Sequence, residues 1–146
     1  MLLLSEWVIE MNTNALIKIK TSTADDDTIE LMTQGAYYEK NNSYYILYEE
    51  NEEMGMSNCS VIIKVNGDEV QVTRKGDFSS KMIYKEGDRF EFLYHMPYGA
   101  MPIVSTTKKV KINLDENGGD IKLVYHLSVN DENTVNVLRI TVEKGK

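Results

Sequence analysis

The stretch CSVIIKVNGDEVQVTRK, residues Cys59–Lys75, decides the fold. Apolar and polar side chains alternate on both sides of Asn66-Gly67, which is the pattern of strands that bury one face. Asn-Gly suits a two-residue type I′ turn, because both central residues of that turn need a positive φ. The stretch therefore predicts an antiparallel hairpin, with Val70 and Val72 on one face of its second strand.

The same period of two continues along the chain from Asn14, and turn residues such as Asn, Gly and Asp interrupt it at short intervals. Consecutive strands joined by such short turns must pair antiparallel, because a parallel pair needs a long crossover. We expect about ten strands, over residues 14–22, 28–40, 43–50, 59–65, 69–75, 78–85, 89–96, 103–114, 121–129 and 134–144.

A closed barrel is the architecture that these strands favour. An antiparallel sheet of this many strands curls, and closure removes its exposed edges. Long strands with near-neighbour connections favour a barrel over a sandwich, which needs Greek-key crossings and usually has shorter strands. We therefore expect an all-β, antiparallel up-and-down closed barrel of about 8–10 strands, forming a single domain over residues 12–146.

Residues 1–11, MLLLSEWVIEM, precede the regular pattern and are expected to be an extension of the domain. Their apolar run is too short to span a bilayer, and it lacks the basic region and cleavage site of a secretory signal. We therefore expect a cytoplasmic protein that does not associate with membranes. One hypothesis is that Met11 is the natural start; the alternative is a short helix or strand that covers a barrel edge.

The charge of the 146-residue chain is −7, with 23 acidic and 16 basic residues. Nucleic-acid binding needs a surplus of Lys and Arg, so we expect no nucleic-acid partner. The basic run KKVK, residues 108–111, is expected to be a solvated strand face. The single cysteine, Cys59, cannot form an internal disulfide and is expected to be a small buried hydrophobe.

No metal site, cofactor or catalytic residue is expected. His95 and His126 lie on the opposite parity from the apolar rows of their strands, so both are expected to point outward, too far apart for a zinc site. Asp25–Asp27 is expected to be a turn rather than a calcium site. The acidic run YEENEE, Tyr48–Glu53, is expected to be a solvated loop tip rather than a catalytic carboxylate pair.

Arg74 is the most informative single residue. Alternation from Val72 places it on the inward row, where a charge is costly unless it is paired or near solvent. It either plugs the barrel end, bonded to carbonyls and hydroxyls, or presents its guanidinium to an anionic head group. The structural role is favoured, because small barrels fill their interiors with side chains. The inward rows are rich in aromatic residues and methionine: Met82, Tyr84, Phe90, Phe92, Tyr94 and Met96.

The stretch YHMPYGAMPIVSTTKKV, Tyr94–Val110, carries the turn residues Pro97, Gly99 and Pro102. It is expected to form a wide connection at the rim of the barrel. A small ligand would enter there.

The runs GAYYEKNNSYYILYEE (Gly35–Glu50), VTRKG (Val72–Gly76) and YHMPYG (Tyr94–Gly99), with Thr107 beyond them, resemble the YwiB-like family of small Firmicutes proteins. The resemblance covers nearly all of the chain except its first eleven residues. It implies a lipocalin-like, calycin-type barrel in the cytoplasm, and no established activity. The chain lacks the signal peptide, the disulfide pair and the Gly-x-Trp signature of secreted lipocalins, so ligand binding is implied by fold analogy alone.

The function that these observations favour is non-enzymatic binding of a small amphipathic or anionic molecule. The residues expected at the barrel mouth are Arg74, Tyr94, Tyr98, Thr107 and Phe90. The alternative is a structural or interaction module with a solidly packed barrel, whose acidic loops or edge contact a protein partner or a second copy of the chain. An enzyme is disfavoured, because no catalytic constellation stands out.

Overall fold

The computed structural model describes residues 14–23, 28–51 and 58–145. The expectations for residues 1–11, for Asp25–Asp27 and for Glu52 and Glu53 lie outside these residues. The described chain is built of ten β-strands, without a helix. Their bounds are β1 Ala15–Thr23, β2 Thr28–Lys40, β3 Ser43–Glu50, β4 Cys59–Asn66, β5 Glu69–Gly76, β6 Ser80–Lys85, β7 Arg89–Met96, β8 Gly99–Asp115, β9 Gly118–Val129 and β10 Glu132–Lys144.

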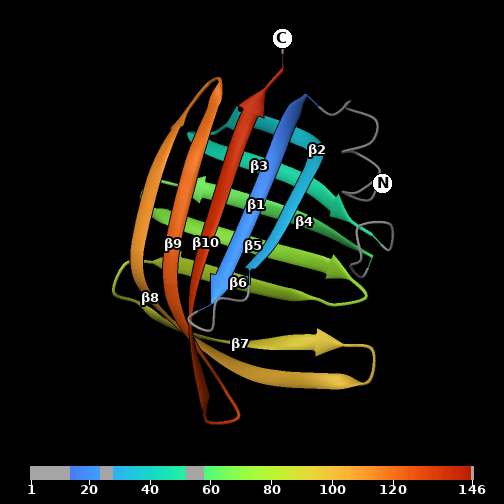
Figure 1. Ribbon diagram of the computed structural model, residues 1–146, viewed down its shortest axis with the longest axis vertical. Coiled ribbons are helices and arrows are strands. Elements are labelled where there is room, and N and C mark those ends of the chain that lie inside the picture. Colours follow the sequence, from blue (N-terminus) through green and yellow to red (C-terminus); the bar gives the residue numbers. More distant parts are fainter. Residues whose placement is uncertain (1–13, 24–27, 52–57, 146) are drawn as a thin grey trace.

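The ten strands form one antiparallel sheet that rolls into a nearly closed barrel, which confirms the expected fold class (Figure 1). The order in the sheet is β6-β5-β4-β3-β2-β1-β10-β9-β8-β7, so every strand except the two at the ends pairs with two neighbours. In Figure 1, β8, β9, β10, β1 and β2 lie side by side in front, and β3 to β6 run across behind them.

Gly35 marks the point at which β2 passes from one half of the barrel to the other. Residues 28–35 pair with β1, whereas residues 36–40 pair with β3. A Cβ atom at Gly35 would collide with the carbonyl oxygen of Leu47 and with Cδ1 of Ile17. Glycine is therefore needed here, because the two halves of the barrel approach each other across its backbone.

The interior of the barrel is filled by side chains. In β4 the buried and half-buried positions alternate strictly, with Val61 and Ile63 facing inward. They join one continuous cluster to which nine of the ten strands contribute buried or packed residues, Ile17, Tyr84 and Leu123 among them. Each fully buried aliphatic or aromatic side chain stabilises the fold by about 1.5–3 kcal/mol. This packed interior is the main source of stability, and Cys59 is buried at its edge, as expected.

The hairpin predicted at Asn66-Gly67 is present, but its turn is displaced by one residue. Asn66 still pairs with Glu69, so the central residues of the turn are Gly67 and Asp68. Only Gly67 has a positive φ, of 61°, which fits a type II′ turn with glycine first rather than a type I′ turn. The prediction of a type I′ turn was wrong, whereas the predicted strands and their antiparallel pairing are confirmed.

The expectation of a wide connection around Pro97, Gly99 and Pro102 was also wrong. Met96 pairs directly with Gly99, so the connection is a tight turn of two residues, Pro97 and Tyr98. Pro102 lies inside β8, at a position before pairing with β9 begins. A proline is tolerated there because that stretch of β8 has a free edge.

Candidate functional site

The barrel has a seam where the two end strands of the sheet, β6 and β7, meet. They are joined by one bridge, in which the Ser79 N–H donates to the His95 carbonyl (2.9 Å) and the His95 N–H donates to the Ser79 carbonyl (2.8 Å). Beyond the strands, the Gly87 N–H donates to the Thr107 carbonyl and the Thr107 N–H donates to the Asp88 carbonyl, both at 2.9 Å. Between these two closures the edges of β6 and β7 form no ladder.

An open groove of about 1130 Å³ lies along this seam. Its walls combine apolar side chains, polar groups and charges from β5, β6, β7 and β8. The lining residues of this seam groove are Thr73, Arg74, Lys75, Ser79, Ser80, Lys81, Phe90, Glu91, Phe92, Leu93, His95, Pro102, Ile103 and Val104. The mixture is that of a binding site, in which aromatic and aliphatic groups supply contact area and a few polar groups orient a ligand.

The seam groove is locally basic in an acidic protein. Its lining contains three basic residues, Arg74, Lys75 and Lys81, against one acidic residue, Glu91, whereas the whole chain has a charge of −7. Glu91 is itself paired with Arg89, at 2.8 Å between Oε1 and Nη1. Arg74 is paired with Glu50, so Lys75 and Lys81, which form no ion pair with a described residue, supply the positive charge that favours an anion.

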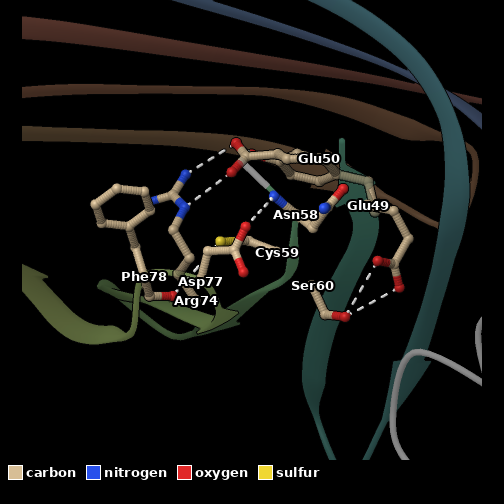
Figure 2. Close-up of polar contacts among 9 residues, drawn as sticks. Glu49, Glu50, Asn58, Cys59, Ser60, Arg74, Asp77 and Phe78 are labelled. Carbon is tan, nitrogen blue, oxygen red and sulfur yellow. Dashed lines mark hydrogen bonds and ion pairs between the residues drawn. The ribbon is translucent and has the colours of Figure 1, made fainter. Parts of the chain in front are cut away.

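Arg74 lies at the inner end of the groove and forms a two-bond ion pair with Glu50 (Figure 2). Its Nε donates to Oε1 and its Nη2 donates to Oε2 of Glu50, both at 3.0 Å. Strand β4 lies between the two strands that carry them, since Arg74 stands opposite Val61 and Glu50 stands opposite Cys59. The side chain of Glu50 is 5% exposed and that of Arg74 is 24% exposed, so the pair faces the barrel on one side and the groove on the other.

Arg74 stays positively charged. Burial by itself lowers the pKa of the guanidinium, but the hydrogen bonds and the negative charge of Glu50 outweigh burial and raise that pKa above its ordinary value. Planar two-bond pairing also fixes the orientation of the guanidinium. Nη1 takes no part in either bond to Glu50.

Four tyrosines lie near this ion pair. The Tyr48 hydroxyl donates to Oε2 of Glu50 at 3.5 Å, and burial together with the Glu50 charge raises the pKa of Tyr48. Burial also raises the pKa of Tyr94, against the opposing effect of Arg74. The rings of Tyr84 and Tyr125 lie 4.8 Å apart, and burial raises the pKa of each. All four phenols are therefore neutral at pH 7 and stay hydrogen-bond donors.

Comparison with known proteins places the chain in a family. Residues 15–140 match the family described as Domain of unknown function (DUF1934). The chain belongs to this family. It is 30% identical over 141 residues to the "Uncharacterized beta-barrel protein YwiB" of Bacillus subtilis (strain 168), which covers 94% of this chain and 98% of that protein. The crystal structure of the ywiB protein from Bacillus subtilis superposes with a TM-score of 0.83 at 28% identity, over 92% of this chain and 93% of that one.

These matches confirm the YwiB-like resemblance and its barrel. Within this DUF1934 barrel the five residues expected at the mouth divide into two groups. Arg74 and Phe90 line the seam groove, and the ring of Tyr94 packs beside it against Phe78, at 5.7 Å between centroids. Tyr98 is 84% exposed at the tip of the β7–β8 turn, and Thr107 is 1% exposed, with its backbone in the seam closure. The geometry therefore brings together Arg74, Phe90 and Tyr94, and not the other two.

Sequence reasoning missed Glu50, the partner of Arg74. The run YEENEE was expected to be solvated, yet Glu50 is 4% exposed as a residue. Counting by two from Ile46 and Tyr48 along the same strand would have placed Glu50 on the inward row. Lys75 and Lys81 were missed because they enter the groove only through the separation of β6 from β7, which no local pattern reveals.

The inward rows are only partly as expected. Tyr84 is 2% exposed and Met82 packs against the core, but Phe90, Phe92 and Tyr94 are half-buried. The reason is that β7 borders the seam, so its inward face opens onto the groove.

Metal ligands do not cluster in the part of the DUF1934 chain that the structure describes, where His, Cys, Asp and Glu form no group of three or more. His95 and His126 are both exposed, on the outer faces of β7 and β9, as expected. Within the described ranges no helix is long and apolar enough to cross a membrane.

Proposed function

We propose that this DUF1934 barrel binds a small amphipathic anion in the seam groove, without catalysing a reaction on it. One observation carries the proposal. An open groove of about 1130 Å³ has aromatic and aliphatic side chains on its β7 and β8 side and basic residues on its β5 and β6 side. A ligand with an apolar body and an anionic head satisfies both walls at once.

The apolar body of the ligand would lie against β7 and β8. Phe90 and Phe92 stand side by side there, with ring centroids 6.0 Å apart and planes within 17° of each other. Ile103 and Val104 continue the same wall on β8. Aromatic rings of this kind give a large contact area at a low cost in conformational entropy, because only two side-chain torsions are fixed on binding.

The anionic head would lie at the edge of β5 and β6, where Arg74 is on the inner face and Lys75 and Lys81 are on the outer face. The two bonds from Glu50 hold the guanidinium of Arg74 in place before the ligand arrives, while Nη1 is left out of that pair. Preorganisation of this kind lowers the entropy lost on binding. Lys75 and Lys81 are exposed and supply charge that Glu50 does not neutralise.

The expectation of a lipocalin-like binder is accordingly changed in one respect. A lipocalin ligand sits inside the barrel, whereas the interior here is occupied by the packed side chains around Ile17, Tyr84 and Leu123. We therefore infer a binding site in the wall of the barrel rather than in its lumen. A cytoplasmic location and the absence of nucleic-acid and membrane partners from this site remain part of the proposal.

The second candidate is a structural or interaction module, and the packed interior is the observation that favours it. A barrel of this size is commonly filled solid. In that case the seam groove would receive a side chain or a strand of a protein partner or of a second copy of the chain.

Calorimetric titration with dodecanoate, an alkyl carboxylate, tests the proposal, and native mass spectrometry of protein purified without denaturation looks for a co-purifying ligand. We expect dodecanoate to bind the wild type. The double variant Lys75→Gln/Lys81→Gln should weaken the affinity for dodecanoate by about tenfold. Phe92→Ala should also weaken that affinity, because contact area is lost. The matched control Lys40→Gln/Lys85→Gln removes two exposed charges outside the groove and should bind as the wild type does. A wild type that is apo in the mass spectrum and binds no dodecanoate would overturn the proposal in favour of the interaction module.

A further inference from the structure

A row of four cations crosses the outer face of the barrel. Lys20 of β1 stands directly opposite Arg139 of β10, Arg139 stands opposite Lys122 of β9, and Lys122 stands opposite Lys111 of β8. These four strands lie side by side in front in Figure 1. We call Lys20, Arg139, Lys122 and Lys111 the basic row.

The row lies on the outside because the residues next to it on the same strands point inward. Ile140 and Ile121 are each 1% exposed in the core, and Ile19 and Ile112 pack against the same cluster. Since successive side chains of a strand point to opposite faces, the four cations share the outer face. Neighbouring strands are about 4.8 Å apart, so the row follows the curved wall across four strands for about 14 Å.

Such a row works against the stability of the fold. Like charges directly opposite each other on paired strands repel and destabilise the sheet. The one acid at the end of the row is Glu30 of β2, opposite Lys20, and their charged atoms are 3.6 Å apart with the side chains 70% and 50% exposed. Among the described residues no carboxylate forms an ion pair with the other three cations. Three aligned cations without a carboxylate partner among the described residues, beside a fourth that is paired only at the surface, favour an anion from outside.

The surface beside the row is hollowed. A groove of about 420 Å³ lies at the β1 end, and its lining residues are Lys18, Ile19, Lys20, Glu30, Leu31, Met32, Arg139 and Thr141. At the other end, Lys109 precedes Lys111 on the outer face of β8. Lys18 and Lys109 therefore lie beside Lys20 and Lys111 along the same strands and widen the row at both ends.

We propose that the basic row binds a linear polyphosphate anion, with successive phosphates lying along the line of cations. Charge complementarity selects this occupant, since a chain that carries a charge on every repeating unit matches charges set out in one line. On β9 and β10 the row is flanked by Val124 and Val137 on one side and by Asp120 and Thr141 on the other, none of which offers an aromatic surface on which a nucleic-acid base could stack. A row one side chain wide on a curved wall also meets a flat bilayer only along a narrow strip, which disfavours a membrane.

This site is separate from the proposed small-molecule site, because no residue of the row lines the seam groove. The row cannot be recognised in the sequence, because positions 20, 111, 122 and 139 are far apart in the chain and only strand pairing aligns them. The KKVK run was expected to be a solvated face of one strand, and its Lys111 is one member of the row. The other three members lie on three further strands.

The test is a binding titration of the full chain with long-chain inorganic polyphosphate at several salt concentrations, with single-stranded and double-stranded DNA and with phosphatidylglycerol vesicles as competing probes. We expect polyphosphate to bind tightest, with an affinity that falls steeply as salt rises. Lys122→Gln/Arg139→Gln should weaken binding by about tenfold and reduce the salt slope by about two. The control Lys40→Gln/Lys85→Gln, which removes the same charge elsewhere, should change binding less than about twofold.

Thermal unfolding of the same variants separates recognition from folding. Lys122→Gln/Arg139→Gln should unfold at the same or a higher temperature than the wild type, because it removes a repulsive pair. An absence of polyphosphate binding at low salt, an equal loss of affinity in the row and control variants, or tighter binding of DNA or vesicles than of polyphosphate would each overturn the proposal.

Discussion

Arg74 and Glu50 lie on strands that are not neighbours, and their side chains meet over β4 in a two-bond ion pair with both contacts at 3.0 Å. The pair adds a charged contact to a mainly apolar barrel interior and at the same time presents the guanidinium to the seam groove. One contact thus serves stability and, in our proposal, recognition. The two roles can be separated by experiment.

Breaking this ion pair from one side should destabilise the barrel strongly. Arg74→Ala leaves the carboxylate of Glu50 buried without its cationic partner, and we expect the free energy of unfolding to fall by about 3 kcal/mol. That is the lower end of the usual range, because Arg74 is itself 24% exposed. Urea unfolding measures the change. Arg89→Ala is the matched control, since the Arg89–Glu91 pair is about two-thirds exposed, and it should cost less than about 1 kcal/mol.

Replacing both partners by apolar side chains should restore most of the lost stability. In Arg74→Met/Glu50→Leu no buried charge is left unpaired, and such replacements are often neutral or stabilising. Urea unfolding of the double variant close to the wild type supports the account. A double variant as unstable as Arg74→Ala would show that the packing of the guanidinium, rather than charge pairing, is what the fold needs.

Stability should be lost at alkaline pH through the buried tyrosines. Burial raises the pKa values of Tyr48, Tyr84 and Tyr125 above the ordinary value of about 10. The folded state therefore holds these protons more tightly than the unfolded state does, so their contribution is fully present below about pH 10 and is lost as the pH rises further. Chemical unfolding across this range should show the decline, and Tyr48→Phe should make it shallower. A free energy of unfolding that stays constant above pH 10 would contradict the prediction.

Gly35→Ala should distort the crossing of β2 between the two halves of the barrel. The added methyl group meets the carbonyl of Leu47 and the side chain of Ile17, neither of which can move freely. We expect a loss of about 2–3 kcal/mol in the free energy of unfolding, as for other overpacked sites. Gly67→Asn is the control: its turn position is open, so only the strain of the positive φ of 61° opposes the new side chain, and the loss should be smaller, about 1 kcal/mol.

The Ser79–His95 bridge should control the opening of the seam. Ser79→Pro removes the N–H that donates to the His95 carbonyl, and we expect faster hydrogen exchange at the His95 amide and along β7. Ser79→Ala keeps the backbone donor and should exchange as the wild type does. Equal exchange in both variants would show that the closure at Thr107, rather than this bridge, holds β7 in place.

The fold was largely readable from the sequence because alternation is a local signal. A period of two placed all ten strands and even the inward orientation of Arg74 correctly. The turn at Asn66-Gly67 shows the limit of that signal, since register depends on the pairing of whole strands and shifted the turn by one residue.

The site was harder to predict, because it depends on how distant strands meet. Glu50 was hidden in an acidic run, and Lys81 reaches the groove only because β6 and β7 part from each other. Tyr98 looked like a mouth residue because proline and glycine flank it, yet these residues serve a tight turn. Local composition does not reveal which end of a sheet fails to close.

The most direct measurement of the central claim is an NMR titration of the isotope-labelled protein with dodecanoate. We predict saturable shifts at the backbone amides that border the seam groove, such as Ser80, Phe92 and Val104, and at the Arg74 side chain, while the buried core around Leu123 stays unchanged. Shifts confined to the barrel interior or to another face, or no shift at all with a ligand-free protein, would contradict a binding site in the seam.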